Sequence, residues 1–149
     1  SELPFSPIVA SGVNAANPHH FPTDKAFENG DLVIIDWGAN YEGYFSDITR
    51  TFAIGNTVDS KLMSAYSAVK TANLAARELA KSGVQAGLVD SAARNVIDEA
   101  GFGEYFTHRT GHGLGLEIHE EPYIKPDPTL PLSYWEKRND NMGDIIRES

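Results

Sequence analysis

Two aspartates, Asp36 and Asp47, flank a turn in the segment DLVIIDWGANYEGYFSDITRTFAIG, and this arrangement constrains the fold more than any other feature of the sequence. Residues 32–37 are an apolar, β-branched run, and residues 44–54 are rich in Tyr, Phe, Thr and Ile, which is the composition of strands. Between them, residues 40–43 read Asn-Tyr-Glu-Gly, a cluster typical of a turn. The segment therefore predicts an antiparallel β-hairpin.

The hairpin raises an electrostatic problem if it is symmetric about residues 40–43. Asp36 and Asp47 are equally far from the centre of that cluster, so they would lie directly opposite each other. Opposed residues have Cβ atoms about 4.5–5.5 Å apart, and like charges at that spacing destabilise a sheet. A shared proton or a bound cation offsets the repulsion, and hard divalent metals prefer carboxylate oxygen. The pair therefore predicts half of a metal site; the alternative is that a bulge breaks the symmetry and one aspartate only caps a turn.

The length and composition limit the classes of function. At 149 residues the chain has the length of one domain, and it contains no cysteine. Disulfides, thiolate metal sites and a cysteine nucleophile are excluded, so any metal must be bound by His, Asp or Glu. The formal net charge of −9 argues against nucleic acid as a partner, because phosphate binding needs clustered Lys and Arg. No apolar run approaches the ~18 residues of a membrane helix and no signal peptide is recognisable, which favours a soluble cytoplasmic protein without a membrane partner.

Beyond the hairpin, apolar residues recur at three- and four-residue spacing, which predicts two helices. The first is expected over residues 59–82, with Asp59 or Ser60 as its N-cap and Gly83 ending it in the left-handed conformation. The second is expected over residues 89–100, with Gly101 as its stop. The residues expected to face the core are Leu62, Met63, Tyr66, Val69, Ala76, Leu79 and Ala80 in the first helix and Val89, Ala92, Ala93, Val96 and Ile97 in the second. Neither helix is expected to carry a catalytic residue.

A glycine-rich stretch after residue 101 places His108, His112 and His119 within twelve residues. A lone histidine is more often a hydrogen-bonded structural residue, but three in a frame of glycines at 111, 113 and 115 indicate a site. Neutral imidazole is the commonest metal ligand and an acid–base group near neutral pH. The helical zinc-protease pattern, the glycine-rich phosphate loops and the serine hydrolase elbow do not occur in the sequence.

Three segments, in this order, resemble the pita-bread metallopeptidases and most of all the Xaa-Pro dipeptidase and aminopeptidase P branch. They are IVASGVNAANPHHFPT, GDLVIIDWGANYEGYFSDITRTF and HRTGHGLGLEIHEEP, and the resemblance runs from about Phe5 to about Pro126. It implies an α+β fold in which a curved antiparallel sheet is covered by helices. Residues 1–149 would then form an incomplete catalytic domain, similar to the family as far as about residue 126, with a diverged tail over residues 127–149.

The resemblance assigns metal binding to three residues. Asp36 would be a bidentate ligand of one divalent ion, Asp47 would bridge two ions, and His112 would bind the second ion. Manganese is the expected metal, with cobalt or zinc as alternatives. Two such ions would activate a hydroxide that attacks the peptide carbonyl.

The other histidines would contact the substrate. The resemblance implies that His119 hydrogen-bonds the substrate carbonyl and stabilises the tetrahedral intermediate. It also implies that His19 lies near the scissile bond and that His108 lines the substrate pocket. The alternative for His108 is a purely supporting role, and His20 is expected to be an exposed neighbour of His19.

Members of the family complete the site with two glutamates, in a Glu-Pro-Gly segment and an Arg-x-Glu-Asp-like segment, and neither segment occurs here. The chain is therefore expected to carry the first three metal ligands without the last two. The expected function is metal-dependent hydrolysis of the Xaa-Pro bond at the N-terminus of dipeptides or short peptides, and a homo-oligomer is left open. The alternatives are an inactive homologue or fragment that binds peptide or protein in the cleft, and a partial fold of low stability.

Overall fold

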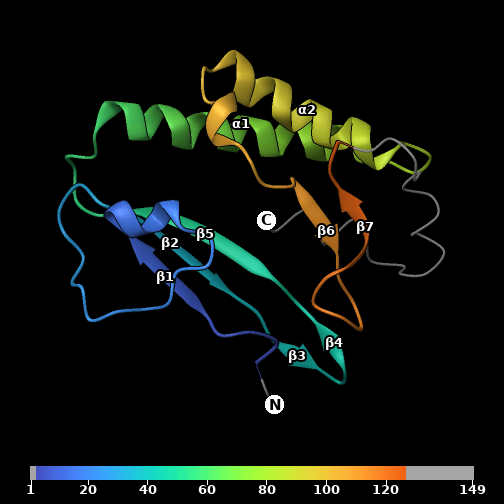
Figure 1. The fold of residues 1–149 in the computed structure, drawn as a ribbon, viewed down its shortest axis with the longest axis horizontal. Helices are drawn as coiled ribbons and strands as arrows, with labels where there is room; N and C mark the ends of the chain where they lie inside the picture. The colour runs from blue at the N-terminus through green and yellow to red at the C-terminus, as the bar shows by residue number, and fades with distance from the viewer. Residues whose placement is uncertain (1–2, 127–149) are drawn as a thin grey trace.

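Antiparallel sheets lie beneath a pair of helices in the computed structural model, which describes residues 3–126 (Figure 1). The strands are β1 (Ile8–Ser11), β2 (Leu32–Trp37), β3 (Asn40–Tyr41), β4 (Tyr44–Phe45), β5 (Ile48–Ala53), β6 (Gly111–Gly113) and β7 (Glu120–Ile124). The helices are α1 (Ser60–Leu79) and α2 (Ala86–Glu99), with short 3₁₀ helices η1 (Gly12–Ala16) and η2 (Gly103–Tyr105). The predicted α+β class is therefore confirmed, and the predicted tail over residues 127–149 lies outside the described residues.

The hairpin forms as predicted, but its turn is centred one residue further along the chain. Strand β2 pairs with both β1 and β5, and its Asp36 lies opposite Thr49. The turn residues are Glu42 and Gly43, with φ of 52° and 89°, so both adopt the left-handed conformation that two-residue hairpin turns favour. The direct opposition of Asp36 and Asp47 was therefore a wrong prediction.

The shift in the turn nevertheless keeps both aspartates on one face of the hairpin. Moving the centre by one residue moves every cross-strand partner by two, and side chains alternate between faces with a period of two. Asp47 is two residues before Thr49, so it is a diagonal neighbour of Asp36 rather than its direct partner. The two carboxylates therefore still repel each other on one face of the hairpin, which is the argument that predicted a metal site.

Helix α1 begins as predicted, but of the face predicted to be core only Ala76 is buried and Ala80 packs against the core. The Asp59 carboxylate accepts hydrogen bonds from the backbone N–H groups of Lys61 and Leu62, at 2.8 and 3.4 Å, which confirms the N-cap. The buried residues are Ala68, Ala72 and Ala76. Of the face predicted to be core, Leu62, Met63, Tyr66, Val69 and Leu79 are 36–58% exposed in the part of the chain that the structure describes. Spacing alone identified an amphipathic helix but not which stripe would meet a partner.

Helix α2 ends in a Schellman motif at Gly101. The Gly101 N–H donates to the carbonyl of Asp98, and the Phe102 N–H donates to the carbonyl of Ile97, while Gly101 has a φ of 79°. The predicted stop is therefore confirmed, although the helix begins at residue 86 rather than at 89. Gly83 also has a positive φ of 84°, but it lies in the turn after α1, whose C-cap is residue 80, so its predicted capping role was wrong.

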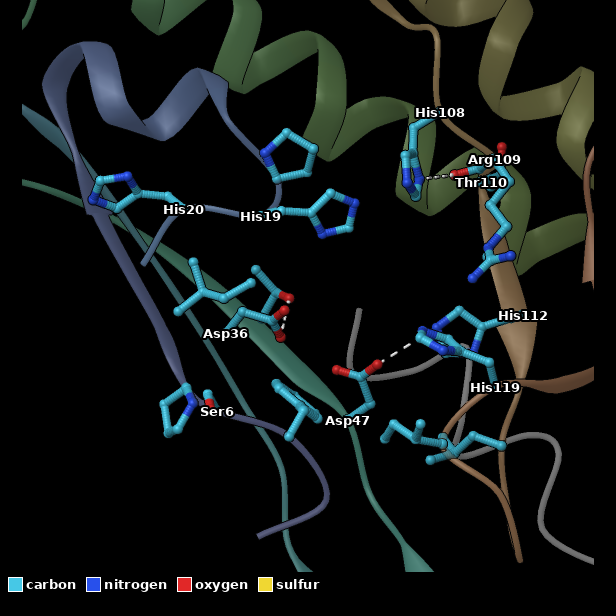
Figure 2. Close-up of a pocket in the computed structure, with 18 of the residues that line it drawn as sticks. Ser6, His19, His20, Asp36, Asp47, His108, Arg109, Thr110, His112 and His119 are labelled. Carbon is cyan, nitrogen blue, oxygen red and sulfur yellow. Dashed lines mark hydrogen bonds and ion pairs between the residues drawn. The ribbon is translucent and has the colours of Figure 1, made fainter. Parts of the chain in front are cut away.

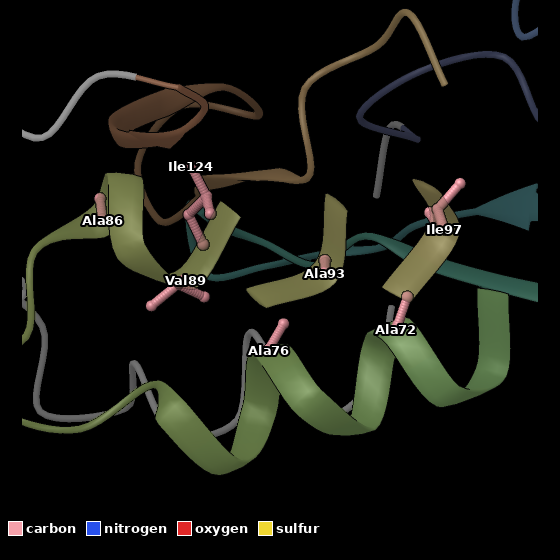
Figure 3. Packing of buried hydrophobic residues seen from close by; sticks show 7 residues of the cluster. All are labelled: Ala72, Ala76, Ala86, Val89, Ala93, Ile97 and Ile124. Atoms are coloured by element: carbon pink, nitrogen blue, oxygen red, sulfur yellow. The ribbon is translucent and has the colours of Figure 1, made fainter. Parts of the chain in front are cut away.

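The core joins the two helices to strand β7 (Figure 3). Small side chains let α1 and α2 approach closely, and Val89 in α2 is completely buried. The buried core cluster consists of Ala72, Ala76, Ala86, Val89, Ala93, Ile97 and Ile124. Since Ile124 belongs to β7, this packing holds the β6–β7 pair against the helices. No helix of the described residues is both long enough and apolar enough to cross a membrane.

Candidate active site

A cavity of about 460 Å³ lies between the β1–β2–β5 sheet and the β6–β7 pair (Figure 2). Its wall includes residues 5–8, the loop over residues 18–21, and residues of the segment 108–119. The site residues predicted from the sequence all line it, namely His19, Asp36, Asp47, His108, His112 and His119. The fold thus gathers side chains from four separate segments around one space.

The two aspartates enter this cavity from the hairpin. The Thr49 hydroxyl donates a 2.8 Å hydrogen bond to Asp36 Oδ1. Burial raises the pKa of Asp36, the Thr49 hydrogen bond partly opposes that rise, and the neighbouring charge of Asp47 adds to it. A cation bound beside both carboxylates would remove this penalty, because it favours their ionised forms.

His112 is held in one tautomer by the backbone. Its Nδ1 lies 2.9 Å from the carbonyl oxygen of Gly113, and a carbonyl can only accept, so the Nδ1–H donates to it. The lone pair of neutral His112 is then on Nε2, which lies 3.4 Å from Asp47 Oδ2. A histidine whose other nitrogen donates to a carbonyl is the usual arrangement of a metal ligand.

Asp47, His112 and His119 form a possible ligand group. Their donor atoms all lie within 4.8 Å of one another, and the rings of His112 and His119 meet edge to face with centroids 4.4 Å apart. One carboxylate and two imidazoles fit a divalent transition metal. The predicted set of Asp36, Asp47 and His112 stays a prediction; in this geometric group His119 is included, and Asp36 stands beside Asp47 outside it. The donor set therefore fits a metal, with Asp36 as a further carboxylate at its edge.

The pKa of His119 is lowered, chiefly by burial and then by the nearby His112 and Arg109. His119 is therefore neutral near pH 7, with one nitrogen able to bind a metal or accept a proton and the other able to donate. It precedes β7, and the loop before it is tied to the hairpin, because the Phe45 N–H donates to the carbonyl of Gly115 at 2.8 Å. This bond links the segment that carries the histidines to the hairpin that carries the aspartates.

The remaining histidines border the cavity. His19 and His108 are exposed, and His20 is half-buried. His20 also lines the cavity, so the expectation that it is an exposed neighbour of His19 was wrong. The Asn17 side chain accepts a hydrogen bond from the His19 N–H at 3.0 Å, which orders the loop that presents both rings.

Two residues with clear roles in the cavity were missed. Thr49 stands two positions after Asp47, so strand periodicity places both side chains on the same face of the hairpin. That periodicity was the sequence signal from which Thr49 could have been identified. Arg109 carries the only Lys or Arg side chain among the described residues that line the cavity. Its guanidinium lies 4.9 Å from the Tyr123 ring centroid, and its Nε is buried without a hydrogen-bond partner. Its positive charge contributes to the lowered pKa of His119, and nothing in the local sequence pattern distinguished it.

We expect Asp36→Asn to stabilise the metal-free chain at neutral pH by about 0.5–1 kcal/mol, the scale of one cross-strand pair. Asn still accepts the Thr49 hydrogen bond but carries no charge to be buried beside Asp47. Because the folded-state pKa of Asp36 is raised above the ordinary 3.8, wild-type stability falls as the pH rises through that pKa. The advantage of Asn should therefore be absent below the ordinary value and present at neutral pH.

Urea unfolding in the presence of a chelator, from about pH 3 to about pH 7, measures this difference. Asp31→Asn is the control, because hydrogen bonds from the Glu28 N–H and from Lys25 lower the pKa of Asp31. That variant should lose stability at neutral pH. A metal-free Asp36→Asn protein less stable than wild type at neutral pH would contradict the electrostatic account.

The comparisons with known proteins agree on one family. Residues 1–142 match the model of metallopeptidase family M24. The probable dipeptidase PepE of Mycobacterium tuberculosis is 51% identical over 133 residues, which cover 89% of this chain and 35% of the relative. The Xaa-Pro dipeptidase of Pyrococcus horikoshii is 50% identical over 120 residues, which cover 80% of this chain and 34% of the relative. The chain therefore spans about a third of the length of these relatives.

Solved structures show the same relationship. The dipeptidase of Pyrococcus horikoshii OT3 superposes with a TM-score of 0.83 at 53% identity, covering 87% of this chain and 36% of that chain. The prolidase of Pyrococcus furiosus gives a TM-score of 0.82 at 46% identity, covering 87% of this chain and 38% of that chain. These neighbours confirm the predicted pita-bread fold. The chain belongs to metallopeptidase family M24.

Proposed function

We propose that this chain forms the metal-binding part of the active site of an Xaa-Pro exopeptidase. The observation that carries the proposal is the convergence of Asp47, His112 and His119 within 4.8 Å, beside a second carboxylate with a raised pKa. The names of similar proteins, Xaa-Pro dipeptidase and prolidase, support a substrate with proline after the scissile bond. Because the chain spans about a third of those proteins, the activity of the whole enzyme is part of the proposal.

In this proposal Asp36, Asp47 and His112 would be the residues that hold two divalent ions. Ions bound there would act as Lewis acids on the substrate carbonyl and lower the pKa of the hydrolytic water. His119 donates a hydrogen bond from its ring N–H to the carbonyl oxygen as negative charge develops there. Its lowered pKa keeps the ring neutral near pH 7, so its other nitrogen remains available to the metal.

The other cavity residues orient the peptide. His19 borders the scissile bond, and His108 contacts the substrate from the opposite wall. Manganese as the metal, a proline-containing peptide as the partner and the division of the chain into a family-like part and a diverged tail remain predictions from the resemblance. The cytoplasmic location and the absence of nucleic acid and membrane partners remain predictions from charge and hydropathy.

The test is release of the N-terminal residue from Ala-Pro by this chain, with saturating Mn²⁺ and with a chelator, while elemental analysis counts the metal per chain. Ala-Ala is the matched substrate without proline. We expect turnover of Ala-Pro that requires the metal and exceeds turnover of Ala-Ala. No turnover at saturating metal would reject independent catalysis by this chain.

A second candidate is a cavity that binds peptides without hydrolysing them. The observation that favours it is the described ligand group, which holds three donors where two ions would need more. Peptide binding that persists after chelation, with no turnover at saturating metal, would support this function, and measurable turnover would exclude it.

A further inference from the structure

A charged side chain is fully buried in helix α2, away from the metal ligands. Asp90 has no exposed surface, and it is among the largest fully buried side chains of the described residues. Its Oδ2 accepts a hydrogen bond from Arg94 Nε at 3.0 Å, and its Oδ1 accepts one from Arg94 Nη2 at 3.0 Å. The Thr110 hydroxyl donates to the same Oδ1 at 2.7 Å. Asp90 therefore connects its own helix to the residue that precedes strand β6.

Arg94 extends the same connection along the chain. Its guanidinium donates to the carbonyl of Phe106 at 2.8 Å and to the carbonyl of His108 at 3.2 Å, and it lies 4.4 Å from the Phe106 ring centroid. On a helix, an Arg four residues after an Asp can form an ion pair with that Asp without contacting any other segment. Here the remaining donors bind backbone oxygens of another segment. Arg94 thus fixes residues 106 and 108, while Asp90 fixes residue 110.

The fixed residues lead directly to the site. His108, Arg109 and Thr110 line the cavity, and His112 follows in β6. On its other side this segment is held by β7, because the Thr110 N–H donates to the carbonyl of Ile124 at 2.9 Å. A displacement of residue 110 therefore moves His108 and His112 relative to the aspartates on the hairpin.

Stability alone gives a weak reason for such a network. Burying an ion pair costs desolvation that its attraction often fails to repay, and an apolar replacement of similar volume is frequently as stable. What the network provides is direction, since each guanidinium nitrogen donates, and each carboxylate or carbonyl oxygen accepts, along a defined angle. We propose that Asp90, Arg94 and Thr110 are positioning residues that set the places of His108 and His112 in the cavity.

The proposal uses Mn²⁺ binding as one readout, and to that extent it rests on the proposed function. Thr110→Val removes the hydroxyl at nearly constant shape, and Thr110→Ser restores it. Loss of a partner in the outer shell of a metal site typically lowers metal affinity by 10- to 100-fold. We expect about a 10-fold loss of Mn²⁺ affinity for Thr110→Val, the lower end of that range, and a return to near wild type for Thr110→Ser.

The second readout needs no metal. Nitrogen-15 NMR of the metal-free protein reports the tautomer and surroundings of each imidazole, so the His112 and His108 signals should move in Thr110→Val and return in Thr110→Ser. Arg94→Lys keeps a charge beside Asp90 but cannot bind both carbonyls with a planar fork, and it should shift the same signals. It also provides the test if Thr110→Val fails to fold.

Ala68→Gly on helix α1 is the control for general destabilisation, because α1 lines no part of the cavity in the described residues. It should lower the thermal midpoint and leave the histidine signals and the Mn²⁺ affinity unchanged. If the wild-type chain binds no Mn²⁺, the proposed function fails while the NMR comparison still decides the positioning role. Unchanged histidine signals in both Thr110→Val and Arg94→Lys would overturn the proposal, as would changes of equal size in Ala68→Gly.

Discussion

Asp47→Asn should lower the affinity of the chain for Mn²⁺ by at least about 100-fold, since loss of a mere outer-shell partner already costs 10- to 100-fold. Asp47 is the carboxylate of the ligand group and faces His112 Nε2 at 3.4 Å. Asn keeps the shape but replaces a charged oxygen ligand with a neutral one, which divalent cations bind far less well. Titration of Mn²⁺ followed by electron paramagnetic resonance or calorimetry measures the change.

The matched control for this substitution is Asp24→Asn. Asp24 is exposed and does not line the cavity, so the same chemical change there should leave Mn²⁺ affinity within about twofold of wild type. Equal losses in the two variants would mean that Mn²⁺ is attracted by the overall negative charge of −9 rather than held in a site. Unchanged affinity in Asp47→Asn would remove Asp47 from the ligand group.

Gly113→Ala should destabilise the chain by about 3 kcal/mol, at the upper end of overpacking costs. A Cβ on Gly113 would overlap the carbonyl of Glu121 and lie 2.9 Å from the carbonyl oxygen of Glu120. These atoms are backbone, so they can move only if β6 and β7 separate where their register shifts, between His112 and Gly113. The Gly113 carbonyl also holds His112 Nδ1, so the His112 ring should lose its orientation in the same variant.

Gly111→Ala provides a comparison within the same strand. Its Cβ would meet the end of the Ile124 side chain at 3.5 Å, an ordinary contact, and Gly111 has no positive φ. We expect a cost below about 1 kcal/mol for this variant, measured by urea unfolding beside Gly113→Ala. Similar costs at the two positions would show that general loss of glycine, rather than the close approach at residue 113, decides stability.

The hairpin shows how far local sequence could predict the site. Alternating strands and a turn cluster predicted the right elements, but Glu42 in a left-handed conformation is uncommon for a residue with a Cβ, and the turn was therefore placed one residue early. Because the error moved partners by two residues, Asp36 and Asp47 stayed on one face. The metal prediction thus depended on which face of the hairpin each side chain occupies. Strand periodicity fixes that face, whereas the exact register does not matter for it.

The helices show what local sequence could not predict. Spacing indicated amphipathic helices, but whether the alanine stripe or the larger residues of α1 would be buried depends on the shape of α2, which no local pattern encodes. Asp90 and Arg94 have the spacing of an exposed helical ion pair, and only the fold brings residues 106–110 onto them. Residues that act through tertiary contacts were therefore missed, whereas residues in a compact motif were found.

Asp47 lies between β4 and β5, whereas His112 lies in β6, and no strand ladder joins β6 to the hairpin in the described residues. The bond from the Phe45 N–H to the Gly115 carbonyl links the two parts beside the site. An ion bound by both Asp47 and His112 would link these two parts of the fold. Binding that favours the folded chain adds stability in proportion to the logarithm of the free metal concentration. The free metal concentration would then also set how long each molecule survives proteolysis, because proteases cleave the unfolded chain.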